Sequence, residues 1–76
     1  MASLVPRAMA QLEERATKGE KSGILYGSGN SKQELSVEQL LNILNGNYDG
    51  FPSDDEEKLR NTATQWLMDS ILRGVQ

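Results

Sequence analysis

Apolar side chains recur every three or four residues in two stretches of the chain, and this spacing predicts two well-formed helices. The longer helix should run from about Asp54 to Arg73, and Gly74 should close it. One stripe of this helix should pack on the shorter helix, and it comprises Leu59, Ala63, Trp66, Leu67, Ser70 and Ile71. Met68 and Leu72 point away from that stripe, so we expect part of this second stripe to face a partner or a symmetry mate.

The shorter helix should span about Val37 to Asn45. Ser36 can cap its first turn, and Gln39, three residues later, completes a capping box. Leu35 and Leu40 are placed as a hydrophobic staple around this box. The same pattern predicts that Ser53 caps the longer helix, with Glu56 at the box position and acidic residues 54–57 in its first turn.

The chain before residue 36 is less regular. Met9, Leu12 and Ala16 predict a short, weak helix that ends at Gly19. Residues 19–33 are rich in glycine, serine and asparagine, and we interpret them as a flexible loop. Gly27 to Lys32 has the glycines of a phosphate-binding loop but lacks the closing Gly-Lys-Ser/Thr, so a linker is favoured.

These elements predict an all-α fold, either a small helical hairpin or a three-helix domain with a glycine-rich loop. Leu4 to Arg7 resembles the thrombin recognition sequence used in expression vectors. We therefore interpret residues 1–8 as a vector remnant and residues 9–76 as one small helical domain. The alternative is that residues 1–8 are native and lead into the first helix.

The composition of this 76-residue chain excludes several classes of ligand and of catalytic mechanism. Eight basic and eleven acidic residues give a net charge of -3, which disfavours binding to nucleic acid. The sequence has no cysteine and no histidine, so thiol catalysis, imidazole catalysis and zinc sites are excluded. No apolar run approaches the roughly 20 residues that cross a bilayer, so we expect no membrane partner and a cytoplasmic protein.

Five oxygen-bearing side chains stand at positions one, three, five, nine and twelve of the segment 45–56, where the two predicted helices are joined: Asn45, Asn47, Asp49, Ser53 and Glu56. With Gly50 at the bend, this segment resembles an EF-hand calcium loop. Pro52 stands where that family places an aliphatic residue whose N–H pairs with a second loop. Turn formation and helix capping also account for these five residues. We therefore expect no cofactor, and bound calcium is the alternative.

The pattern as a whole predicts a small, acidic, non-enzymatic module that binds a protein partner or forms a homodimer. It could act as an adaptor, an inhibitor or an assembly subunit. The expected binding residues lie on the longer helix: Trp66, Leu67, Met68, Ile71 and Leu72. A single EF-hand-like calcium-binding module is the alternative function.

Overall fold

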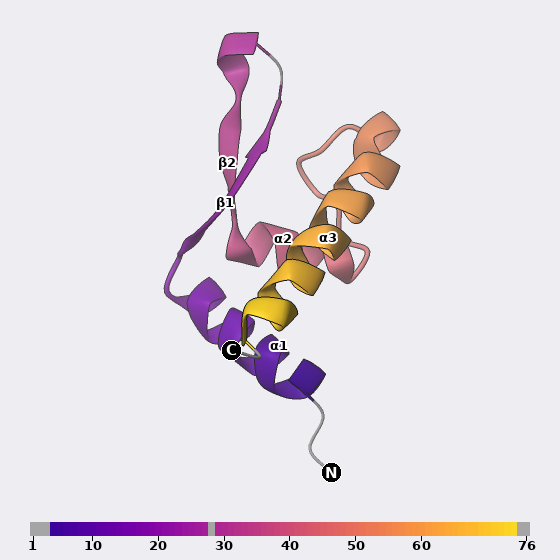
Figure 1. The fold of residues 1–76 in the computed structure, drawn as a ribbon. Coiled ribbons are helices and arrows are strands. Elements are labelled where there is room, and N and C mark those ends of the chain that lie inside the picture. The colour runs from indigo at the N-terminus through magenta and orange to yellow at the C-terminus, as the bar shows by residue number, and fades with distance from the viewer. Residues whose placement is uncertain (1–3, 28, 75–76) are drawn as a thin grey trace.

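The computed structural model describes residues 4–27 and 29–74, with the side chains of Leu4, Val5 and Gly74 left aside. It contains three helices and a two-stranded antiparallel sheet, so the fold is α+β and the prediction of an all-α helical hairpin or three-helix domain is wrong. Figure 1 shows the two strands projecting away from the helical part of the molecule. In chain order the elements are α1 (Leu4–Thr17), β1 (Lys21–Tyr26), η1 (Gly29–Ser31), β2 (Gln33–Ser36), α2 (Val37–Leu44), η2 (Ser53–Asp55) and α3 (Glu56–Gly74).

The β1–β2 hairpin occupies most of the segment that the sequence predicts to be a flexible loop. Along β1, half-buried side chains alternate with exposed ones, and Ser22, Ile24 and Tyr26 form the half-buried set. This period of two is typical of a strand with one covered face. On β2, Leu35 is almost completely buried. The segment is therefore a hairpin and not a flexible loop. One row of inward-facing side chains is enough to hold it against the core, even though its glycines lower the local propensity for a strand.

The pairing of β1 with β2 is interrupted near its start. Lys21 pairs with Ser36 and Leu25 pairs with Glu34, so the register shifts between these two pairs. At this register shift, hydrogen bonds that involve side chains take the place of backbone pairing between the strands. The hydroxyl of Ser22 donates to the carbonyl oxygen of Leu35 at 2.7 Å, and the amide of Gly23 donates to the carboxylate of Glu34 at 2.8 Å. Gly23 takes a φ of +83°, which a glycine adopts readily at such a bulge.

The start of α2 is the one that the sequence predicts. The Ser36 hydroxyl accepts from the Gln39 amide at 3.1 Å, and the Gln39 side-chain oxygen accepts from the Ser36 amide at 2.8 Å, so the capping box is confirmed. Asn45 caps the other end, and Gly46 leaves the helix with a φ of +85°.

The start of α3 differs from the prediction. The chain enters this helix through the 3-10 turn η2, whose N-cap is Pro52 and has no side-chain capping bond. Ser53 therefore lies inside the turn, and the predicted cap at Ser53 is wrong. The ring of Pro52 restricts φ, which is -62° here, and an extended ψ of 140° leads the chain into the turn without a side-chain cap.

The core lies where the three helices and β2 meet, because each element contributes at least one buried side chain. The predicted inner stripe of α3 is confirmed in part: Leu59, Ala63 and Trp66 are buried and α3 packs on α2, whereas Leu67, Ser70 and Ile71 are half-buried. The weak first helix supplies Leu12, which is 3% exposed. The full set of buried apolar residues is Leu12, Leu35, Val37, Leu40, Leu41, Ile43, Leu59, Ala63 and Trp66.

Tyr26 ties the hairpin to the segment that leads into α3, although the sequence assigned it to a loop. Its hydroxyl donates to Asp55 Oδ2 at 2.5 Å, and its ring meets the edge of Phe51 with centroids 5.1 Å apart. The bond to Asp55 raises the pKa of Tyr26 above its ordinary value of 10.0, and desolvation and the negative charge of Asp55 act in the same direction. Because the folded-state pKa is the higher one, this bond stabilises the fold below pH 10 and is lost as the pH rises through the raised pKa.

Replacing Tyr26 with phenylalanine should therefore lower Tm at neutral pH and flatten the decline of Tm above pH 10. Circular dichroism melts of the wild type and Tyr26→Phe at both pH values measure this. Tyr48→Phe is the matched control, because no hydrogen bond joins the Tyr48 hydroxyl to the rest of the described chain. Equal Tm values and equal pH profiles for all three proteins would contradict the role of Tyr26.

Candidate functional site

The C-terminal half of α3 carries a connected apolar surface that runs from the edge of the core to the exposed side of the helix. Met68 is 53% exposed and Leu72 is 65% exposed, whereas Leu67 and Ile71 beside them are half-buried. At about 100° per residue these four side chains span about 140° of the helix circumference, so they form one surface. We call this surface, made of Leu67, Met68, Ile71 and Leu72, the α3 outer face.

The structure separates Trp66 from the other four residues expected to bind a partner. Trp66 belongs to the buried cluster and is only 7% exposed. Leu67 packs against the edge of that cluster, so it links the core to the α3 outer face. Any partner on this face would therefore meet Met68 and Leu72 first and would leave Trp66 covered.

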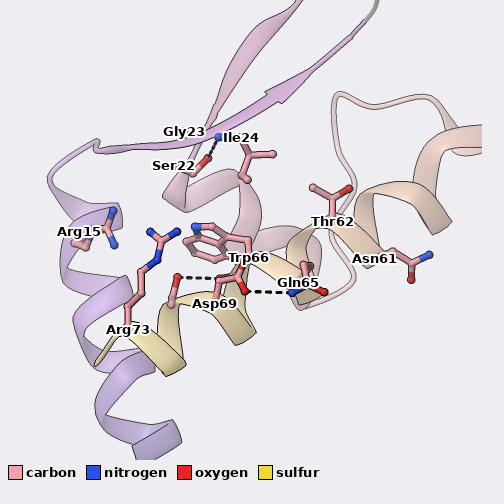
Figure 2. Close-up of a pocket in the computed structure, with 11 residues that line it drawn as sticks. Arg15, Ser22, Gly23, Ile24, Asn61, Thr62, Gln65, Trp66, Asp69 and Arg73 are labelled. Carbon is pink, nitrogen blue, oxygen red and sulfur yellow. Dashed lines mark hydrogen bonds between the residues drawn. The ribbon is translucent and has the colours of Figure 1, made fainter. Parts of the chain in front are cut away.

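A second candidate surface is a hollow of about 630 Å³ between β1 and α3, which we call the β1–α3 hollow. Figure 2 shows the bulged part of β1 on one side, the body of α3 on the other, and the edge of Trp66 between them. Arg15 of α1 lies at one end. The lining residues are Arg15, Ser22, Gly23, Ile24, Asn61, Thr62, Gln65, Trp66, Asp69, Ser70 and Arg73.

Charged side chains in the β1–α3 hollow are held in different ways. Arg15 Nε donates to Glu20 Oε1 at 3.1 Å, and the side chains of this pair remain about two-fifths exposed, at 40% and 43%. Asp69 Oδ1 accepts from the Gln65 amide at 3.2 Å. Arg73 makes no ion pair with the residues that the structure describes. One cationic side chain thus faces this hollow without an anionic partner.

Sequence reasoning missed the β1–α3 hollow for a physical reason. Its lining residues come from α1, β1 and α3, and the strand was interpreted as loop. One signal was available along α3. Asn61, Gln65 and Asp69 recur every four residues, which places polar side chains in one row beside the inner stripe.

The predicted calcium loop runs from the end of α2 through η2 to the first residue of α3, and its five candidate ligands are all exposed. Asn47, Asp49 and Glu56 line one hollow of about 500 Å³, whereas Asn45 and Ser53 lie outside that lining. The side-chain oxygen of Asn47 accepts from the amide of Asp49 at 3.0 Å, as in an ordinary Asx turn. Within residues 4–27 and 29–74, no group of three or more acidic side chains is placed to hold a metal ion.

Among the described helices, none is both long enough and apolar enough to span a membrane. No protein family matches this chain, and no curated protein or solved structure is similar to it. The fold and its surfaces define a small α+β domain with two candidate binding surfaces that share one helix. Its function is therefore inferred from those surfaces.

Proposed function

We propose that this protein is a small, acidic, non-enzymatic module of the cytoplasm that binds another protein through the α3 outer face. One observation carries the proposal: Met68 and Leu72 expose more than half of their surface, and Leu67 beside them packs against the core. Covering a large apolar side chain is favourable by roughly 1.5–3 kcal/mol. Contiguous exposed apolar residues on a small protein are typical of an interaction surface.

The first partner to test is a second copy of this chain. A domain below about 70–80 residues obtains only a few kcal/mol from its single core, and association is a usual remedy. The described core has nine buried apolar residues and no disulfide to assist it. Packing two α3 outer faces together would extend that core across Leu67 and Ile71 without a change in the fold.

Replacing both Met68 and Leu72 with glutamate should abolish association and leave the helix content unchanged. Two carboxylates on the α3 outer face would have to be desolvated in the complex, and that cost exceeds the apolar gain. Sedimentation velocity at several concentrations measures association, and circular dichroism measures helix content. Gln11→Glu with Asn42→Glu is the matched control, because it adds the same charge at exposed positions of α1 and α2.

Each outcome of that experiment is informative. Association that survives in Met68→Glu/Leu72→Glu would contradict the proposal. Equal loss of association in the control would also contradict it, because that loss would be a general effect of the added charge. Loss of helix content in the double variant would mean that the two side chains belong to the core. A wild-type chain that stays monomeric at every concentration would exclude the second copy and leave a different protein as the partner.

A calcium-binding module is the second candidate function, and the hollow lined by Asn47, Asp49 and Glu56 favours it. Sedimentation in EDTA and then in millimolar calcium separates the two candidates. Under the calcium hypothesis, compaction or association appears only with calcium and disappears in Asp49→Ala/Glu56→Ala. Under the leading proposal calcium has no effect, and that variant loses at most about 1 kcal/mol from the first turn of α3.

A further inference from the structure

We propose that the β1–α3 hollow is a separate binding site that takes the carboxylate of an extended peptide. None of its lining residues belongs to the α3 outer face, so this inference does not depend on the proposed function. Three N–H donors reach the hollow from two helices: the guanidinium groups of Arg15 and Arg73 and the indole N–H of Trp66. A carboxylate is the ligand that such forked donors match best, because each guanidinium offers parallel N–H bonds.

Arg73 is an exposed cationic side chain of this hollow that has no ion-pair partner among the described residues. Asp69 precedes it by one helical turn, which is the spacing at which such side chains pair. No ion pair joins them in the described structure, and Asp69 is bonded to Gln65 instead. Figure 2 shows the guanidinium of Arg73 extended toward the indole ring of Trp66, into the hollow.

Trp66 and Arg15 supply the other donors. The indole ring is buried, but Figure 2 shows its nitrogen on the edge that faces Arg73. That nitrogen has no acceptor among the described residues, and no buried side-chain nitrogen there lacks a partner, so the N–H opens on the hollow. Arg15 is bonded to Glu20 through Nε only, which leaves its two terminal NH₂ groups available.

The surrounding charges favour a carboxylate over a phosphate. Glu20 already offsets much of the charge of Arg15, and Asp69 lines the same hollow. The two arginines and the two carboxylates sum to zero charge, so a bound monoanion adds one net negative charge and a dianion adds two, which favours the monoanion. An exposed row of Asn61 and Gln65 continues along α3 from this point, and amide side chains can bond the backbone of an extended chain.

The test uses Trp66 as a built-in probe, because it is the only tryptophan of the chain. The indole N–H cross-peak in a ¹H–¹⁵N spectrum is followed while a short acetylated peptide is added. Three forms are compared: a free C-terminal carboxylate, the same peptide amidated, and an amidated peptide with one internal glutamate. We expect a saturable shift with at least one carboxylate form and none with the uncharged amide. The form that binds identifies the source of the carboxylate.

Variants decide whether Arg73 forms part of the site. Arg73→Gln should weaken binding at least tenfold, and Arg73→Lys should recover only part of that loss because lysine keeps the charge without the fork. Arg60→Gln is the matched control, since it removes an exposed arginine from the same helix outside the hollow. Thermal melts confirm that each variant folds.

Three results would overturn this inference. The first is the absence of a saturable shift with every carboxylate peptide. The second is an equal loss of binding in Arg60→Gln and Arg73→Gln, which would report a general charge effect. The third is tighter binding of inorganic phosphate than of any carboxylate peptide. The α3 outer face remains intact in all these proteins, so failure here is distinguishable from failure of self-association.

Discussion

Replacing Leu40 with alanine should leave much of the chain unfolded at room temperature. Leu40 has no exposed surface and lies on α2, which contacts both α1 and α3. Truncating a buried leucine to alanine costs about 2–5 kcal/mol, because apolar contacts are lost and a cavity remains. A single core in a domain of this size supplies only about 3–5 kcal/mol, so one substitution can remove most of the stability.

Urea titration followed by far-ultraviolet circular dichroism measures this effect. We expect a lower free energy of unfolding in Leu40→Ala, with a shortened or absent folded baseline. Leu25→Ala is the matched control, since Leu25 is 62% exposed and its truncation should cost no more than about 1 kcal/mol. If both variants unfold at the same urea concentration as the wild type, Leu40 is not part of the cooperative core.

Replacing Gly27 with alanine should break the tip of the hairpin. Gly27 follows β1 directly and has a φ of +120°, a conformation that side chains rarely adopt. An added Cβ would lie 2.9 Å from the carbonyl oxygen of Ser31 and 3.2 Å from the Cα of Lys32, so it would collide with backbone. Backbone strain of this kind costs about 1–3 kcal/mol before the collision is counted.

Gly29→Ala is a close control for Gly27→Ala. Gly29 lies two residues further along, with a φ of +57°, and an added Cβ there meets nothing within 4 Å. The cost should be the 1–2 kcal/mol or so of one left-handed residue, without loss of pairing. Cross-strand nuclear Overhauser effects between Leu25 and Glu34 report the hairpin. If these effects persist in Gly27→Ala, the described geometry of the hairpin tip is wrong. If they are lost in both variants, the hairpin is no more sensitive at Gly27 than at Gly29.

The helix α3, which at 19 residues is the longest described element, borders three different surroundings. One side buries Leu59 and Ala63 against α2. A second side, with Gln65 and Arg73, forms a wall of the β1–α3 hollow. The remaining side in its C-terminal half is the α3 outer face. Variants on these sides therefore separate stability, carboxylate binding and self-association from one another.

Local sequence patterns predicted the presence of the helices and the buried side of α3, although not the way in which α3 begins. The capping box at Ser36 and the apolar spacing along α3 act within one or two turns, and such local interactions can be identified without knowing the fold. The same spacing predicted that Met68 and Leu72 would point away from the core, and both are exposed in the structure. Gly19 marked the end of the first helix, where it takes a φ of +72°.

Only the tertiary structure decided the hairpin and the hollow beside it. A strand is stabilised by its pairing partner and by the core, so the glycine-rich segment carried too little local signal. Once β1 pairs with β2, Tyr26 reaches Asp55, 29 residues further along the chain. Arg15, Trp66 and Arg73 come together in the same way, from α1 and α3. Proximity between residues on different elements is a property of packing, and no pattern within a single segment encodes it.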